Sequence, residues 1–217
     1  MSIEARGWRR SRGLPGPYTL EQLAQDVRDV ITDAGLEDYV LVGHSAGGKV
    51  AQLVAAAPPA GLAELVLVAP VPCKPAATIT PEFQEQLLHA YDSEKAVAAG
   101  RDHILTATPL SDDLKAQIVA DSRDAVPEAR DEWARHGIIQ DITSQARTIE
   151  VPVLVIAGEN DRLEPEQVLR DNLLPYLTKA ELHVIPRTGH LTPLEAPADL
   201  ARILQTALAE AKPAQGH

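Results

Sequence analysis

Residues 39–57 read YVLVGHSAGGKVAQLVAAA, which contains the patterns of a strand and of a helix with a glycine-rich turn between them. The apolar run YVLV has the length of a short buried strand, and the residues after the serine form a helical pattern that ends at two prolines. Between them, Gly43 and Gly47 flank Ser45, which predicts a sharp strand-to-helix turn that exposes the serine hydroxyl. We expect Gly43, Gly47 and Gly48 to relieve crowding in this turn.

The rest of the chain alternates strands with helices. Its apolar runs are continuous, as is typical of parallel strands covered on both faces. The predicted elements are a helix at 19–34 with Thr19 as N-cap and Gly35 as stop, strands at 39–42, 65–69, 153–157 and 182–185, and helices at 46–57, 165–174 and 193–211. This order indicates an α/β fold with a mostly parallel sheet flanked by helices.

The alternation stops between residues 71 and 148. This segment holds a proline-rich turn and short amphipathic helices, such as PEFQEQLLHAY and SDDLKAQIVADS, with no strand-like run. We therefore expect an α/β core made of residues 1–70 and 149–217, and a helical insertion made of residues 71–148.

The composition restricts the class of protein and its partners. The 217 residues fit one domain, and the net charge of −11 disfavours nucleic acid or an anionic membrane as a partner. No run approaches the roughly 18 apolar residues of a membrane span. The single cysteine, Cys73, excludes an intramolecular disulfide and fits a cytoplasmic protein. No HxH or HExxH spacing is present, so we expect no metal.

Polar residues follow the predicted strands at the positions that acyl-transfer chemistry requires. A serine hydroxyl needs a histidine base and a carboxylate that holds the imidazole. Asp161 follows the third predicted strand in GENDR, and His190 follows the fourth in RTGHL. We expect Ser45 to be the nucleophile, His190 the general base and Asp161 its partner, with the backbone N–H of Ala46 binding the developing oxyanion.

Other residues compete for these roles. Glu159 and Glu164 are the nearest rivals of Asp161. His44 adjoins the nucleophile, and we expect it to point elsewhere. The remaining histidines lie in the insertion, within a strand or at the end of the chain, and are expected to have no catalytic role: His89, His103, His136, His183 and His217.

The stretches YTLEQLAQDV, VLVGHSAGG, VLVIAGENDR and VIPRTGHLTPLEAP resemble the α/β-hydrolase superfamily. The resemblance extends from the first predicted helix to the last one, apart from the insertion. It implies the roles already given to Ser45, Ala46, Asp161 and His190. It also implies that residues 71–148 form a cap over a pocket for a small-molecule substrate, and that no cofactor is needed.

The N-terminal segment departs from the pattern that this resemblance implies. Members of the superfamily usually have several strands and a His-Gly loop before the segment that here reads EARGWRRS, with Glu4 in place of an aspartate and Arg9 in place of a glycine. We therefore expect a chain that is N-terminally truncated relative to the family, with one oxyanion donor fewer, reduced activity and an exposed sheet edge that favours a homodimer. The nearby arginines form either an anion-binding arm or, as is more common, a solvated loop: Arg6, Arg9, Arg10 and Arg12.

These features predict a serine hydrolase of the esterase type, which acts on an ester or related carbonyl through an acyl-enzyme. Cofactor-free perhydrolases, haloperoxidase-like enzymes, lactonases and C–C bond hydrolases resemble this chain equally well and stay open as alternatives. A non-catalytic or vestigial binding protein with the same fold is the alternative from a different class.

Overall fold

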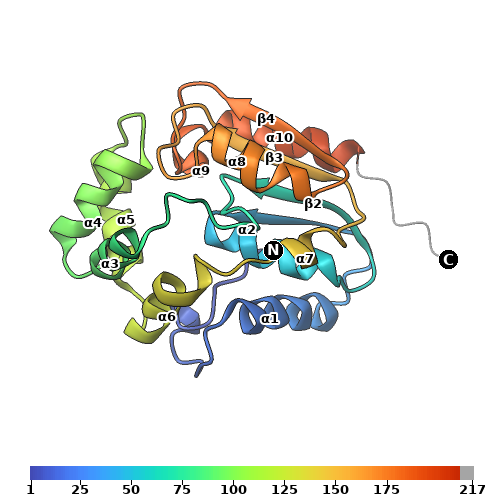
Figure 1. Ribbon diagram of the computed structural model, residues 1–217, viewed down its shortest axis with the longest axis horizontal. Helices are drawn as coiled ribbons and strands as arrows, with labels where there is room; N and C mark the ends of the chain where they lie inside the picture. Colours follow the sequence, from blue (N-terminus) through green and yellow to red (C-terminus); the bar gives the residue numbers. More distant parts are fainter. Residues whose placement is uncertain (211–217) are drawn as a thin grey trace.

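The computed structural model describes residues 1–210, which form a four-stranded sheet between layers of helices (Figure 1). The strands are β1 (Tyr39–His44), β2 (Leu62–Val68), β3 (Val153–Gly158) and β4 (Ala180–Ile185). They lie in the order β1-β2-β3-β4, and each neighbouring pair is parallel. The predicted α/β fold with a parallel sheet is therefore confirmed.

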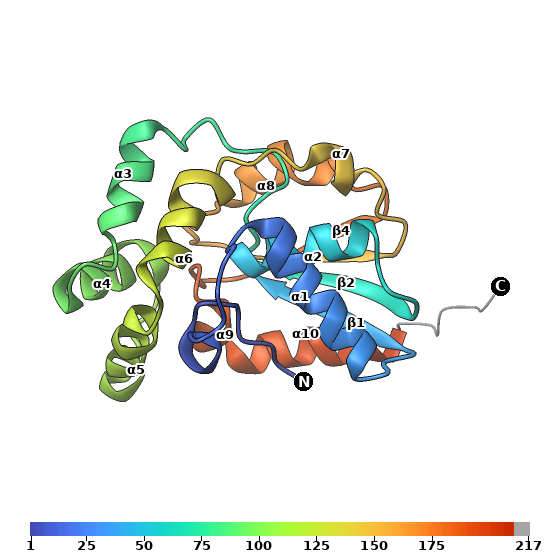
Figure 2. The same ribbon diagram turned by 90° about the horizontal axis from the view of Figure 1, so that it is seen from below.

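Helices cover both faces of this sheet. Figure 2 shows α1 and α2 on one side of the strands and α10 on the other. The α-helices of the described residues are α1 (Leu20–Asp33), α2 (Ala46–Ala56), α3 (Pro81–His89), α4 (Glu94–Gly100), α5 (Asp112–Arg123), α6 (Pro127–Glu132), α7 (Thr143–Ala146), α8 (Glu166–Asn172), α9 (Thr192–Glu195) and α10 (Pro197–Glu210). None of these helices is long and apolar enough to cross a membrane.

The central strand β2 shows why the apolar runs are continuous. Leu65 and Leu67 belong to the core cluster formed with α1, α2 and α8, whereas Val66 and Val68 belong to the cluster formed with α10. Because successive side chains of a strand point to opposite faces, a strand covered on both faces needs an apolar residue at every position.

The first helix begins and ends where the sequence predicts. The Thr19 hydroxyl accepts a hydrogen bond from the Gln22 backbone N–H at 3.3 Å. Gly35 follows the helix with φ of +59°, a conformation that glycine adopts at little cost. Leu20 and Ile31 are buried against α2 and the sheet, so the amphipathic pattern describes real packing.

The predicted closing helix at 193–211 is wrong as a single element. The structure has α9 and α10 with a break at Ala196, whose backbone lies at φ −135° and ψ 53°. Pro197 causes the break, because its ring disfavours the helical conformation of the preceding residue and it has no N–H to donate. Residue 211 lies outside the described residues.

The segment between β2 and β3 is helical, as its pattern predicts. It contains α3 to α7 and two π-helical turns, η2 (Arg101–Leu105) and η3 (Trp133–Gly137). Its bulk, α3 to α6, lies together beside the sheet in both views (Figures 1 and 2). In the described residues this segment forms one isolated antiparallel β-bridge, between Ala125 and Trp8 of the N-terminal segment.

The arginines of the N-terminal segment have acidic partners within the chain. Arg6 makes a bidentate contact with Asp26 on α1, at 2.6 and 2.8 Å. The other ion pairs are Arg9 with Glu4 and Asp121, Arg10 with Glu4, and Arg12 with Asp124. Each of these arginines is paired with a carboxylate, which favours the solvated loop over the anion-binding arm.

Strand β1 is the edge of the sheet formed by the described residues. It pairs with β2 alone in this part of the chain. Val42, in the middle of β1, keeps 48% of its surface exposed. An apolar side chain next to an unpaired strand edge is a feature that proteins usually cover.

Candidate active site

Ser45 occupies a strained turn between β1 and α2. Its backbone lies at φ 52° and ψ −124°, and its N–H donates to the Val68 carbonyl at 3.1 Å. A non-glycine residue in such a conformation costs roughly 1–3 kcal/mol and persists only where the surroundings impose it. The turn therefore holds the serine at the carboxyl edge of the sheet.

Two of the three glycines around the turn are required by space. A Cβ at Gly43 would lie 2.5 Å from the Gly47 carbonyl oxygen, and one at Gly48 would lie 2.7 Å from the Pro70 Cβ. At Gly47, by contrast, an added Cβ would meet no atom within 4 Å. The expected relief of crowding is confirmed for Gly43 and Gly48 and is wrong for Gly47.

The side chains of Ser45, His190 and Asp161 form a hydrogen-bonded chain. His190 Nε2 lies 2.8 Å from Ser45 Oγ, and His190 Nδ1 lies 2.8 Å from Asp161 Oδ2. Both the imidazole and the carboxylate are buried. A carboxylate at Nδ1 favours the tautomer with a proton there, which leaves Nε2 free to accept the serine proton.

The Asp161 carboxylate is fixed by its own loop. Its Oδ1 accepts hydrogen bonds from the backbone N–H groups of Leu163 and Glu164, at 2.9 and 3.0 Å. Oδ2 accepts the hydrogen bond from His190 Nδ1, so the two carboxylate oxygens have different partners. This turn explains why the aspartate, rather than Glu159 or Glu164, faces the imidazole.

The loops after β3 and β4 lie against each other because these strands are parallel neighbours. A Cβ at Gly158, the last residue of β3, would lie 2.4 Å from the Gly189 carbonyl oxygen. The Asn160 N–H also donates to the Thr188 carbonyl at 2.9 Å. Gly158 thus permits the close approach that brings Asp161 to His190, a role that the sequence analysis missed.

Glu195 on α9 joins the loop of His190 to the insertion. Its carboxylate accepts hydrogen bonds from the backbone N–H groups of Ala107 at 2.7 Å, Thr108 at 2.9 Å and Gly189 at 3.1 Å. No sequence motif identifies this residue. Its position three residues after Thr192 in α9 gives no signal of a partner 88 positions away in the chain.

His44 points toward the site, contrary to the expectation that it points elsewhere. Its Nε2 lies 2.9 Å from the backbone oxygen of His190, and the two ring centroids are 5.4 Å apart. Burial lowers the pKa of His44 to about 4, so the ring is neutral at neutral pH. Because a carbonyl oxygen only accepts, Nε2 carries the proton and holds the backbone of His190.

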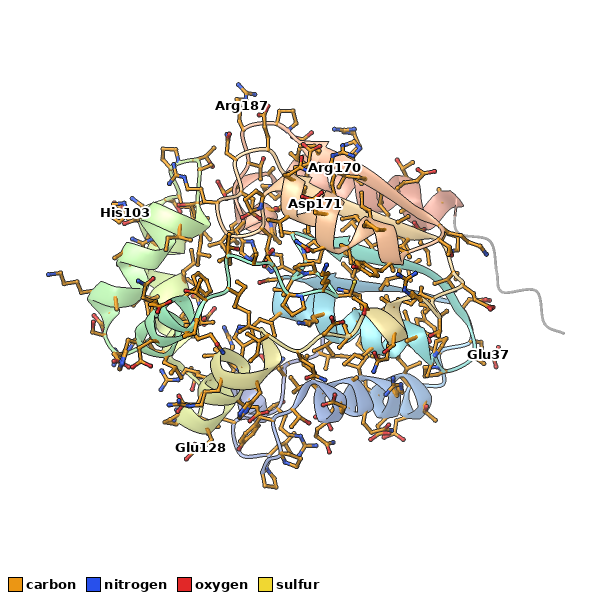
Figure 3. The ribbon with its side chains drawn as sticks, viewed as in Figure 1. Glu37, His103, Glu128, Arg170, Asp171 and Arg187 are labelled. Atoms are coloured by element: carbon orange, nitrogen blue, oxygen red, sulfur yellow. The ribbon has the colours of Figure 1, made fainter. Side chains whose placement is uncertain are left out.

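The other polar candidates lie apart from these contacts. His103 is on the outer side of the insertion and points away from the molecule (Figure 3). Glu159 is exposed and accepts a hydrogen bond from the Arg187 backbone N–H. Among residues 1–210 no cluster of three potential metal ligands is present.

The N-terminus of α2 faces the serine. Ala46 is the first residue of this helix, and the N–H groups of a first helical turn have no acceptor within the helix. Such groups and the helix dipole favour a negative charge beside them. The arrangement fits the predicted binding of an oxyanion by the Ala46 N–H.

A cavity of about 1190 Å³ opens beside the serine. Ser45 and His190 line it together with residues of α1 and β1 and with apolar side chains of the insertion, including Phe83, Ile104 and Trp133. The insertion thus contributes a wall of the space in which Ser45 lies.

Lys49, one helical turn beyond Ser45, is fully buried. Its ammonium donates to the Ile138 carbonyl oxygen at 3.3 Å. Burial lowers the pKa of Lys49 to about 8, whereas electrostatic interactions with Cys73, Glu164 and Asp141 oppose this effect. A buried lysine with a single hydrogen bond is costly, and the sequence analysis did not identify it.

The chain is similar to known proteins over most of its length. The sequence profile of the alpha/beta hydrolase family matches residues 2–203. The chain is 31% identical over 199 residues to the “Putative carbamate hydrolase RutD” of Variovorax paradoxus, which covers 88% of this chain and 73% of the relative. It is 27% identical over 203 residues to a non-heme haloperoxidase of Rhodococcus erythropolis, which covers 86% of this chain and 73% of the relative.

Solved structures give a further comparison. An esterase from Exiguobacterium antarcticum matches with a TM-score of 0.85 and 19% identity, covering 95% of this chain and 80% of that chain. A bromoperoxidase from Bacillus anthracis matches with a TM-score of 0.85 and 14% identity, over the same shares of the two chains. At these identities the likeness concerns the fold alone.

Proposed function

Because the chain belongs to the alpha/beta hydrolase family, we propose that it is a serine hydrolase that cleaves an ester or a related carbonyl compound. The observation that carries this proposal is the hydrogen-bonded chain from Ser45 Oγ through His190 to Asp161, with both distances at 2.8 Å. This geometry gives a weak nucleophile the base that it needs.

The proposed reaction begins with transfer of the Ser45 proton to His190 Nε2 as Oγ attacks the substrate carbonyl. The oxyanion of the tetrahedral intermediate accepts a hydrogen bond from the Ala46 N–H. His190 then protonates the leaving alcohol, and an acyl group stays on Ser45. A water molecule, deprotonated by His190, attacks this acyl-enzyme and releases the acid. Asp161 stabilises the imidazolium in both halves of the reaction.

We assign substrate selection to the insertion. In this proposal residues 71–148 form a cap, while residues 1–70 and 149–217 form the core that carries the reacting groups. Support comes from the apolar insertion residues that line the cavity beside Ser45. A large, mostly apolar cavity suits a small molecule with an apolar acyl or alcohol group. The chemistry requires no cofactor.

Covalent labelling tests the proposal without knowledge of the substrate. The purified chain is incubated with a fluorophosphonate probe, and the intact mass is measured for the parent, Ser45→Ala, His190→Ala and Ser144→Ala. Ser144 is an exposed serine in the insertion and serves as the matched control. We expect labelling of the parent and of Ser144→Ala, none of Ser45→Ala, and labelling slowed at least about 10³-fold in His190→Ala.

Two results would contradict the hydrolase. A parent that is folded by circular dichroism but is not labelled would favour a vestigial binding protein. Equal labelling of Ser45→Ala would mean that the probe reacts elsewhere on the surface. Either result removes Ser45 from the role of nucleophile.

A second candidate differs only in the group that attacks the acyl-enzyme. One relative is named as a non-heme haloperoxidase, and a perhydrolase of this kind would use hydrogen peroxide in place of water and release a peracid. Adding hydrogen peroxide to an ester assay and measuring peracid against free acid separates the two reactions. Peracid as the main product at millimolar peroxide would favour the perhydrolase.

A further inference from the structure

Glu164 is a buried carboxyl group that the proposed reaction does not use. Its residue is 3% exposed and lines the same cavity as Ser45 and His190. Its backbone N–H donates to Asp161 Oδ1, which fixes the start of the side chain beside the reacting groups. Within residues 1–210 its carboxyl group makes no hydrogen bond and no ion pair.

The carboxyl group keeps access to the cavity. Among the fully enclosed side-chain nitrogen and oxygen atoms of the described residues, only Gln52 Oε1 lacks a hydrogen-bond partner. The unpaired oxygens of Glu164 are therefore not fully enclosed, and the space that they reach is the cavity that this residue lines. A buried polar group without a partner is unfavourable, so a partner in the cavity would be stabilising.

Two charged side chains act on Glu164 from neighbouring elements. Asp161 lies in the same loop and Lys49 lies on α2, where its ammonium donates to the Ile138 carbonyl oxygen. Burial is the main influence and raises the pKa of Glu164 to about 8. The charge of Asp161 also raises this pKa, whereas the charge of Lys49 lowers it. At neutral pH the group is therefore mainly a neutral carboxylic acid, which has an O–H to donate.

We propose that Glu164 forms a polar subsite in the cavity, which selects substrates that carry a hydrogen-bond acceptor oxygen, such as an ether, hydroxyl or carbonyl group, apart from the carbonyl that is attacked. This subsite rests on the proposed function, since it orients the ester that Ser45 attacks. A cationic substrate group fits less well, because Lys49 would repel it.

The energetic basis is the cost of leaving the acid unpaired. An all-carbon chain beside Glu164 would displace water from the carboxyl group and offer no acceptor in return. A site built around a buried hydrogen-bonding group discriminates against ligands that cannot pair with it. We expect kcat/KM to be about tenfold higher for the oxygen-containing substrate, which is the effect that the free energy of one hydrogen bond inside a protein can produce.

The test uses nitrophenyl esters in which an ether oxygen replaces one methylene of the acyl chain, at each position in turn beyond the α-carbon. For each ester, kcat/KM is divided by its rate of hydrolysis by hydroxide, which removes differences in intrinsic reactivity. The parent is compared with Glu164→Leu, Glu164→Gln and Glu132→Leu. Glu132 also lines the cavity, but its carboxylate is already bonded to His136 at 2.9 Å, which makes it the matched control.

We expect the parent and Glu132→Leu to prefer one oxygen position about tenfold over the all-carbon ester, and Glu164→Leu to lose this preference. Glu164→Gln should keep it, because the amide also donates. Above pH 8 the preference should decline in the parent, where the donor ionises, and stay constant in Glu164→Gln. No preferred position in the parent, or an equal preference in Glu164→Leu, would overturn the subsite.

The subsite and the proposed function fail in different ways. Hydrolysis of the all-carbon ester that depends on Ser45 supports the hydrolase whatever the ratio between esters. If no ester is turned over, methyl ketones with the same chains are titrated onto Ser45→Ala by calorimetry. Tighter binding of an ether-containing ketone, lost on Glu164→Leu, supports the subsite without turnover, and equal binding of all chains overturns it.

Discussion

Replacing Lys49 with methionine should stabilise the fold below about pH 8. Methionine has nearly the volume of lysine and carries no charge, so it fills the space that Lys49 fills between α2 and the insertion. Burial lowers the pKa of Lys49 from its ordinary value of 10.5 to about 8. The difference corresponds to a cost of about 3 kcal/mol for carrying the charge in the folded state.

Part of this gain is lost with the hydrogen bond to the Ile138 carbonyl, which contributes about 1 kcal/mol. The expected net gain for Lys49→Met is therefore about 2 kcal/mol near pH 6. The gain in stability should decrease as the pH rises. Because the folded state binds the proton less tightly, the cost is fully present below about pH 8 and disappears as the pH rises toward 10.5.

Urea unfolding, followed by circular dichroism at about pH 6, 8 and 10, measures this gain directly. Lys74→Met, which changes an exposed lysine, is the matched control and should leave the free energy of unfolding nearly unchanged. In a Glu164→Gln background the gain at pH 6 should be nearly unchanged, because burial raises the pKa of Glu164 to about 8 and the group is already neutral at that pH. A gain that is equal at pH 6 and pH 10, or a loss of stability at pH 6, would contradict a buried charge on Lys49 as the source of the cost.

Three further predictions concern the turn and its surroundings. His44→Ala should lower kcat about tenfold while the fold is kept, because the His190 backbone loses its donor at 2.9 Å, and ester kinetics with circular dichroism would check this. Ser45→Gly should have a higher melting temperature than Ser45→Ala, by the equivalent of about 1 kcal/mol, since glycine accepts the positive φ. Gly43→Ala should unfold at a lower temperature by the equivalent of about 3 kcal/mol, whereas Gly47→Ala should be tolerated, as calorimetry of the pair would show.

Much of the architecture could be predicted because it depends on local patterns. Continuous apolar runs predict buried parallel strands, and the parallel arrangement predicts that residues following β1, β3 and β4 meet at one edge. The structure finds Ser45, Asp161 and His190 in contact at that edge. Their roles in catalysis stay predictions until the labelling experiment is done.

What the sequence did not predict depends on contacts between distant segments. The partner of His44 is a backbone oxygen 146 positions away, and those of Glu195 are amides in the insertion. No local pattern distinguishes such residues from ordinary surface or core positions. The break before Pro197 is a different case, because that proline is visible in the sequence and should have ended the predicted helix there.

Glu195 should couple the local unfolding of two segments that are far apart in the chain. Its one carboxylate bonds the Ala107 and Thr108 amides of the insertion and the Gly189 amide beside His190. Local unfolding of either segment breaks bonds of the same side chain, so the two segments should open as one cooperative unit. In hydrogen exchange these three amides should therefore show similar protection, and the insertion and the His190 loop would lose their order together.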